Sequence, residues 1–188
     1  MQRLYPGISG CRPFNIKKTA FNGRRTEIVM EITEEMNLKM ENVLSFRGKV
    51  DKNTLAEKRN EIDKLIKDFG AHAIHPAITT SFGVEQTANG PIIDMEILVP
   101  LDRDVSREIL VKQIPGYRFK PEFLLANAVR IHHTGASSLE DSIKELYSYI
   151  QTRNLRPITT LYNITVNDPE DPKDLIVDLM IGIDPNKL

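Results

Sequence analysis

The chain has 188 residues, of which 40% are hydrophobic and 27% are charged, and its formal net charge is −1 at pH 7. These values are typical of one globular domain, or of two small halves that share a core. The near-neutral charge gives no electrostatic case for binding nucleic acid or an anionic membrane, and no apolar run approaches the roughly 20 residues of a membrane span.

The first 26 residues are poorly patterned and are expected to form an N-terminal extension to a domain at 27–188. The opening MQRLYPGISGCRPFNIKK is broken by proline, glycine and charge and lacks the apolar core of a signal peptide, so a cytoplasmic location is expected. Arg24 and Arg25, shortly before Met30, are what a mistranslated ribosome-binding site would encode. Both Met1 and Met30 therefore remain candidate starts.

The segment from 42 to 101 predicts a strand, a helix and two further strands. Residues 43–50 (VLSFRGKV) alternate apolar and polar side chains, which is the period of a strand. DKNTLAEKRNEIDKLIKDFG places its apolar residues on one helical stripe and ends at Gly70, a residue typical of a helix C′ position. ITTSFGVEQ and IIDMEILVP alternate again and flank Asn89-Gly90, a strong hairpin signal.

The segment from 124 to 184 repeats this order after a crossover at 102–123. In the crossover Pro115, Gly116 and Pro121 prevent one long helix. ANAVRIHHTG predicts a strand, SSLEDSIKELYSYIQTRN a helix, and PITTLYNITV and LIVDLMIGI two strands. The two ITT triplets lie 80 residues apart, and we interpret them as one strand position in two copies of a duplicated unit.

Three motifs of the second half give the family resemblance: HHTG before a helix, the aromatic-bearing PITTLYNI, and NDPEDPKDLIVDLMIGI. Their order resembles the GyrI-like superfamily, which includes effector-binding domains of multidrug-responsive transcription regulators such as BmrR. The resemblance covers residues 27–184. It implies an α+β fold in which two βαββ repeats form one curved antiparallel sheet, with helices on one face and a cleft on the other. It also implies a cleft for flat, apolar, often cationic molecules around an acidic residue.

Strand alternation assigns each residue to a face of the sheet. The more apolar parity is expected to be core: Ile78, Phe82, Ile93, Met95, Ile97, Ile158, Tyr162, Ile164, Val177, Leu179 and Ile181. The other parity is expected to face the cleft: Ser45, Arg47, Asp94, Glu96, Leu98, Arg130, His132, Leu161, Asn163, Asp178 and Met180.

The candidate ligand-binding residues are Glu96, Asp94, Asp178, Leu161, Tyr162, Arg130, His132, Leu98 and Met180. A carboxylate in an apolar cleft would favour a cationic guest. The alternative is a solvated sheet face with weak cross-strand ion pairs. Tyr162 matches the aromatic of the family, although its parity places it in the core. Leu161 departs from the family, because cation-binding members carry an acid near this aromatic.

The expected function is non-catalytic binding of a small apolar or cationic molecule, with a regulatory or sequestering role. One alternative is a hydrolase on the same fold, with Glu96 as the base and Tyr162 or Tyr117 as its partner. Another is a protein-interaction accessory module, and homodimerisation through the amphipathic helices is left open. Direct nucleic-acid binding is not expected, because residues 1–42 are too short and too poorly patterned for a helix-turn-helix.

No cofactor or metal is expected. Cys11 is the single cysteine, which excludes a disulfide framework and a thiolate site. His132 and His133 are neighbours in a strand and must face opposite sides. His72 and His75 have a helical ligand spacing but lie between Gly70 and Pro76 in a predicted loop.

Overall fold

The structure combines antiparallel strands with helices that pack on them. The computed structural model describes residues 13–16, 30–51, 54–88, 90–134, 138–167 and 174–186. In chain order its elements are β1 (Pro13–Ile16), β2 (Met30–Asp51), α1 (Thr54–Asp68), β3 (Ile78–Thr87), β4 (Gly90–Pro100), α2 (Ser106–Lys112), β5 (Tyr117–Thr134), α3 (Leu139–Thr152), β6 (Tyr162–Thr165) and β7 (Ile176–Gly182). The pairings of β1 with β2, β2 with β4, β3 with β4, β5 with β7 and β6 with β7 are antiparallel. The predicted α+β class is confirmed.

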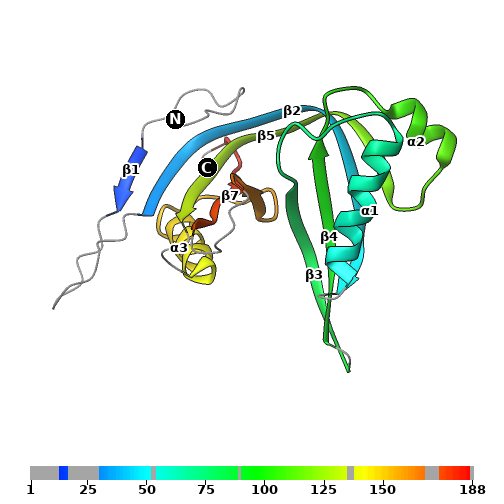
Figure 1. Cartoon of the computed structure of the whole chain (residues 1–188). Helices are drawn as coiled ribbons and strands as arrows, with labels where there is room; N and C mark the ends of the chain where they lie inside the picture. The colour runs from blue at the N-terminus through cyan, green and yellow to red at the C-terminus, as the bar shows by residue number, and fades with distance from the viewer. Residues whose placement is uncertain are drawn as a thin grey trace. The chain divides into compact units, whose positions relative to one another are not determined.

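The chain divides into two compact units. One comprises Met40–Phe123, and the other comprises Met1–Lys39 with Leu124–Leu188. The first, which we call the 40–123 unit, contains the larger part of β2, then α1, β3, β4, α2 and the beginning of β5 (Figure 1). The second, which we call the terminal unit, contains β1, the beginning of β2, the remainder of β5, and then α3, β6 and β7. Each unit thus contains strand, helix, strand, strand, the order that the sequence predicts.

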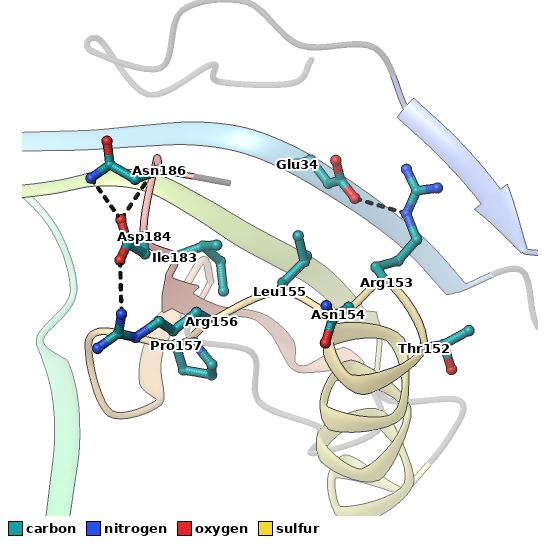
Figure 2. A pocket seen from close by; sticks show the side chains of 10 residues that line it. All are labelled: Glu34, Thr152, Arg153, Asn154, Leu155, Arg156, Pro157, Ile183, Asp184 and Asn186. Carbon is teal, nitrogen blue, oxygen red and sulfur yellow. Dashed lines mark hydrogen bonds and ion pairs between the residues drawn. The ribbon is translucent and has the colours of Figure 1, made fainter. Parts of the chain in front are cut away.

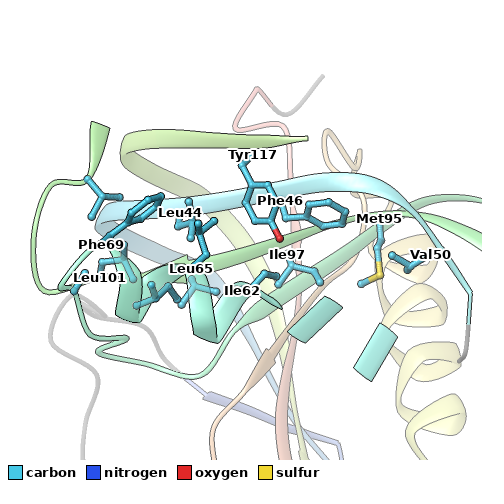
Figure 3. Close-up of a cluster of buried hydrophobic side chains, with 14 residues drawn as sticks. Leu44, Phe46, Val50, Ile62, Leu65, Phe69, Met95, Ile97, Leu101 and Tyr117 are labelled. Carbon is cyan, nitrogen blue, oxygen red and sulfur yellow. The ribbon is translucent and has the colours of Figure 1, made fainter. Parts of the chain in front are cut away.

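The core of the 40–123 unit lies between α1 and the β2–β4 pair. Phe46 is opposite Ile97 in the register, so both side chains emerge on the same face of the sheet. On this face they join the helix residues Ile62 and Leu65 in one buried cluster (Figure 3). The ring of Tyr117 packs on Phe46 with a centroid separation of 5.1 Å. The apolar stripe of α1 and the alternation of two strands therefore meet as the sequence predicts.

The terminal unit is built in the same way around α3. Val129 is opposite Ile181, and Ile131 is opposite Leu179, in the β5–β7 pair. These four side chains form a second buried cluster with the α3 residues Leu146 and Ile150, among others. Ile32 at the start of β2 belongs to the same cluster and is 0% exposed.

Both long helices end in the same hydrogen-bonded closure. At the end of α1 the amide of Gly70 donates to the carbonyl of Lys67 (2.9 Å), and that of Ala71 donates to Ile66 (3.1 Å). At the end of α3 the amide of Asn154 donates to Gln151 (3.0 Å), and that of Leu155 donates to Ile150 (2.9 Å). This is the Schellman pattern, and it requires a left-handed residue at C′. Gly70 and Asn154 have φ values of 65° and 52°, so the predicted stop at Gly70 is confirmed.

The faces of β3 and β6 differ from the sequence prediction. Ile78 is opposite Leu98, and Tyr162 is opposite Met180, so both lie on the faces turned away from the α1 and α3 cores. A bulge at Ser81–Gly83 places Phe82 on the surface, where it is 43% exposed.

The other members of the predicted parities in β6 are reversed too. Ile164 is opposite Asp178 and Asn163 is opposite Leu179, so each lies on the face opposite to its assignment. Ile158 precedes β6 and is 57% exposed, whereas Ile78 begins β3 and is 2% exposed. The two ITT triplets therefore do not occupy equivalent strand positions.

Some sequence predictions fall outside the described residues. Cys11, Asn89 and the predicted N-terminal extension apart from 13–16 are among them. Gly90, the second residue of the predicted hairpin turn, has a φ of 113°. Within the described residues no helix is both long and apolar enough to cross a membrane.

Candidate functional site

The nine predicted ligand-binding residues fall into two groups. Asp94, Glu96 and Leu98 belong to β4 in the 40–123 unit. The other six belong to the terminal unit: Arg130, His132, Leu161, Tyr162, Asp178 and Met180. Each group has its own arrangement of charges on the sheet face turned away from the helix.

Asp178 is the centre of the charged cluster in the terminal unit. His132 lies directly opposite it on β5, and its Nδ1 is 2.7 Å from Asp178 Oδ1. Arg130, two residues earlier on the same strand, places Nη1 3.6 Å from Asp178 Oδ2 and donates from Nη2 to Thr33 Oγ1 at 3.4 Å. The Asp178 side chain is 6% exposed and that of Arg130 is 19% exposed. This is a buried ion-paired cluster.

The titration of the two neighbouring histidines differs because they face opposite sides of β5. The hydrogen bond to Asp178 raises the pKa of His132, although desolvation and the Arg130 charge oppose that shift. His133 Nδ1 lies 2.9 Å from the hydroxyl oxygen of Ser142 on α3. Desolvation, and then the charge of His132, lower the pKa of His133. The expectation that these histidines face opposite sides is confirmed.

The 40–123 unit holds a comparable cluster around Asp94, but nearer the surface. The Arg47 guanidinium donates two hydrogen bonds to the Asp94 carboxylate, each 2.9 Å long. This fork holds the pKa of Asp94 below its usual value. The guanidinium carbon of Arg47 also lies 3.4 Å from the centroid of the Phe82 ring. The two side chains of the ion pair are 41% and 39% exposed.

The two aspartates have similar surroundings. Asp94 is opposite Lys49 and binds Arg47, two residues earlier on β2. Asp178, 84 residues further on, is opposite His132 and pairs with Arg130, two residues earlier on β5. In both units an aspartate therefore has a basic residue opposite it on the paired strand and an arginine two residues earlier on that strand. This arrangement is buried in the terminal unit and exposed in the 40–123 unit.

Glu96 also has partners within the protein. It is 9% exposed, accepts a hydrogen bond from Ser45 Oγ at 2.5 Å and forms an ion pair with Lys120 Nζ at 2.7 Å. Lys120 is not among the residues predicted from sequence, because the neighbouring Pro121 is typical of a break in a regular element. The alternation in YRFKPEF, which begins β5, was the signal that could have identified it.

The remaining predicted residues are apolar or aromatic. Leu98 and Met180 are 0% and 3% exposed, so neither presents surface to a ligand in this structure. Tyr162 is partly buried on the face that carries Met180. Leu161 packs against the core beneath α3, so its assignment to the cleft parity is wrong. The predicted alternation runs through residues 158–161, but β6 begins at Tyr162, so the irregular backbone before it shifts the period.

The chemistry available to these groups is limited by their partners. Tyr117 donates its hydroxyl to Glu61 at 3.0 Å and its ring belongs to the α1 core, whereas Glu96 faces the other side of the sheet. Glu96 and Tyr117 are therefore not placed to act together as a hydrolytic pair. Within the described residues no three histidines, cysteines or carboxylates are placed to hold a metal ion.

The fold was compared with those of known proteins. No family model and no curated protein matches the sequence. The structure superposes on EcmrR in its complex with DNA over 82% of this chain and 57% of that chain, with a TM-score of 0.63 and 14% identity. It superposes on the EcmrR C-terminal domain over 79% of this chain and 95% of that domain, with a TM-score of 0.57 and 12% identity.

The chain has a fold similar to that of the EcmrR C-terminal domain. It spans 57% of the length of the EcmrR chain in the DNA complex, so the likeness concerns one part of that protein. At these identities the likeness extends to the fold alone. It agrees with the predicted resemblance to BmrR-type effector-binding domains at the level of architecture.

Proposed function

We propose that the chain is a non-catalytic small-molecule-binding module of the GyrI-like type, with a regulatory or sequestering role. The observation that carries this proposal is the similarity of fold to a complete domain of EcmrR, over 95% of that domain. Fold alone does not determine function, so the nature of the ligand must come from the residues.

The residues favour a neutral apolar ligand over a cation. Each carboxylate predicted to attract a cation already has a basic partner at short distance: Lys120 for Glu96 (2.7 Å), Arg47 for Asp94 (2.9 Å) and His132 for Asp178 (2.7 Å). At the buried Glu96 and Asp178, a cationic guest would have to displace such a partner and leave it unpaired, which is costly. Buried acids with internal partners therefore give little net attraction for a cation.

Tyr162 is the proposed aromatic contact for the ligand. It is partly buried on the sheet face of Asp178 and Met180, away from the α3 core. A phenol ring at such a place offers apolar area and a polar edge to a planar molecule. In the terminal unit Arg130, His132 and Asp178 lie on this same face and belong to the proposal, with Leu161 acting through the core rather than by contact. The predicted residues of the 40–123 unit, Asp94, Glu96 and Leu98, are not assigned to this contact.

Isothermal titration calorimetry with planar neutral aromatics, quinoline and phenanthridine, tests the binding proposal. We expect saturable binding to the wild type, weakened at least about tenfold in Tyr162→Ala, since removing an aromatic contact costs about 1.4 kcal/mol or more. Tyr147→Ala is the matched control, because Tyr147 is a tyrosine on α3 with 42% exposure. Absence of binding by both compounds, or equal loss in the two variants, would contradict the proposal.

An interaction module is the second candidate function. Its support is α2, where the adjacent Leu110 and Val111 are 72% and 74% exposed. Light scattering after size exclusion tests this idea for self-association. A dimer that Leu110→Ser dissociates would favour it, and a monomer in both proteins would count against it.

A further inference from the structure

A pocket at the end of α3 carries a second set of polar groups that the sheet-face site does not use. Its volume is about 730 Å³. Its lining comes entirely from the terminal unit and comprises Glu34, Thr152, Arg153, Asn154, Leu155, Arg156, Pro157, Ile183, Asp184 and Asn186 (Figure 2). This volume falls within the range of small-molecule sites. None of the nine residues predicted from sequence lines it.

The backbone around the pocket is fixed by hydrogen bonds. The left-handed Asn154 ends α3 and turns the chain toward the end of β7. Pro157 then forms an isolated antiparallel bridge with Ile183, and the amide of Asp184 donates to the carbonyl of Arg156 at 2.9 Å. Arg153 and Arg156 therefore flank the turn at defined positions.

The acids in the pocket are held by neutral donors as well as by the arginines. Glu34 accepts from the Tyr149 hydroxyl at 2.9 Å and from Arg153 Nε at 3.3 Å. Asp184 accepts from the backbone amide and the side chain of Asn186, at 2.9 and 3.1 Å. These neutral donors satisfy part of each carboxylate without consuming a positive charge.

Arg156, in contrast, is loosely held and exposed. Arg156 Nη1 lies 3.6 Å from Asp184 Oδ2, and within the described part of the chain this is its single side-chain ion pair. Its side chain is 72% exposed, and that of Arg153 is 52% exposed. A well-formed arginine–carboxylate pair is bidentate at about 2.7–2.9 Å, so Arg156 keeps donors for a further anion.

The pocket also has an apolar part, formed by Leu155, Pro157 and Ile183. Ile183 is only 4% exposed, so the apolar surface open to a guest is that of Leu155, which packs on the α3 core, and of the exposed Pro157. A guest that places an anionic head on Arg156 would lay its body on these side chains. We infer that this pocket binds a small organic carboxylate, with Arg156 as the main anchor and Arg153 beside it. This site is separate from the proposed sheet-face function and does not depend on it.

Titration of the ¹⁵N-labelled full chain with sodium benzoate tests the inference, with acetate and benzyl alcohol as probes that lack the ring or the charge. At constant ionic strength we expect saturable benzoate shifts at the amides of Asn154, Arg156 and Asp184, and weaker binding of both other probes. Arg156→Gln should weaken benzoate at least tenfold. The matched control is Arg107→Gln on α2, an exposed arginine in the other unit.

Each outcome decides the inference. Benzoate shifts that do not saturate, that occur elsewhere, or that survive both Arg156→Gln and Arg153→Gln would overturn it. Benzyl alcohol binding as tightly as benzoate would also overturn it, because the charge would then contribute nothing. Because Arg156 is largely exposed, Arg156→Gln should keep the melting temperature of the wild type, so loss of benzoate binding in a folded variant supports the site.

Discussion

Replacing Asp178 and Asp94 by asparagine, one at a time, should give very different losses of stability. The substitution removes the same charge from two similar arrangements of an acid, a base and an arginine. Asp178 is 6% exposed and its arginine is 19% exposed, whereas Asp94 and its arginine are 39% and 41% exposed. The difference in burial, and not the number of contacts, should decide the cost.

The magnitudes follow from what each substitution leaves behind. Asp178→Asn leaves Arg130 buried without an ionic partner, and breaking a buried pair in this way costs about 3–5 kcal/mol. Arg130 Nε is already buried with no partner among the described residues, so this guanidinium has little compensation available. Arg47 can be solvated when Asp94 is replaced, so the loss of this exposed pair should cost much less despite its better geometry.

Urea unfolding followed by far-ultraviolet circular dichroism measures both losses. The free energy of unfolding should fall by about 3 kcal/mol or more in Asp178→Asn and by only a small part of that amount in Asp94→Asn. High salt should weaken the Asp94 contribution further and affect that of Asp178 less. Equal losses in the two variants, or a larger loss at Asp94, would show that burial does not control these clusters.

Three further predictions concern the helix-side packing, the helix ends and pH. Leu161→Ala should lower the free energy of unfolding by about 2 kcal/mol and Ile158→Ala by less than about 0.5 kcal/mol, because only Leu161 packs against the core. Urea unfolding measures both losses, and equal losses would contradict the assigned faces. Gly70→Ala should lower the free energy of unfolding by about 1 kcal/mol, because φ is 65° at this position. The added Cβ itself has room, since its nearest neighbour is Arg103 Nη1 at 3.7 Å. An unchanged free energy of unfolding would contradict the left-handed closure. Because the pKa of His132 is raised in the folded state, the stabilisation by His132 is complete below about pH 6.5 and is lost as pH rises through the folded pKa. The difference in the free energy of unfolding between wild type and His132→Gln should therefore shrink from pH 5.5 to about pH 8.5. The lowered pKa of His133 gives the opposite slope, with stability lost as pH falls. Slopes of the same sign for His132→Gln and His133→Gln would contradict one of the two assignments.

The sequence was sufficient where a strand had one apolar face and regular backbone. In β4 and β7 the alternation placed Ile97 and Leu179 correctly against the helices. The helix stops were equally readable, because Gly70 and Asn154 are residues that accept a left-handed conformation.

Alternation failed where the backbone was irregular or both faces were buried. The bulge in β3 exposes Phe82, and the late start of β6 reverses Leu161 and Tyr162. Ile78 and Leu98 are buried on the face away from α1, so hydrophobicity alone did not identify the helix side. A period-two count carries no information about where a bulge inserts a residue.

The candidate site was predictable in residue type but not in pairing. Asp94, Glu96 and Asp178 were found by their strand positions, but their basic partners come from other strands, and Lys120 was hidden by Pro121. The pocket at the end of α3 depends on a turn and on the contact of Pro157 with Ile183, which leave no periodic signal.

Calorimetric titration of the wild-type chain with matched neutral and cationic aromatics tests the proposed function most directly. Quinoline and phenanthridine would be compared with their N-methylated cations in one buffer. We expect the neutral compounds to bind in a saturable way with a negative heat-capacity change, and the cations to bind no more tightly. Tighter binding of the cations that is lost in Asp178→Asn or Glu96→Gln would contradict the neutral-ligand proposal, and no saturable binding by either series would contradict the proposal that the chain binds such small molecules.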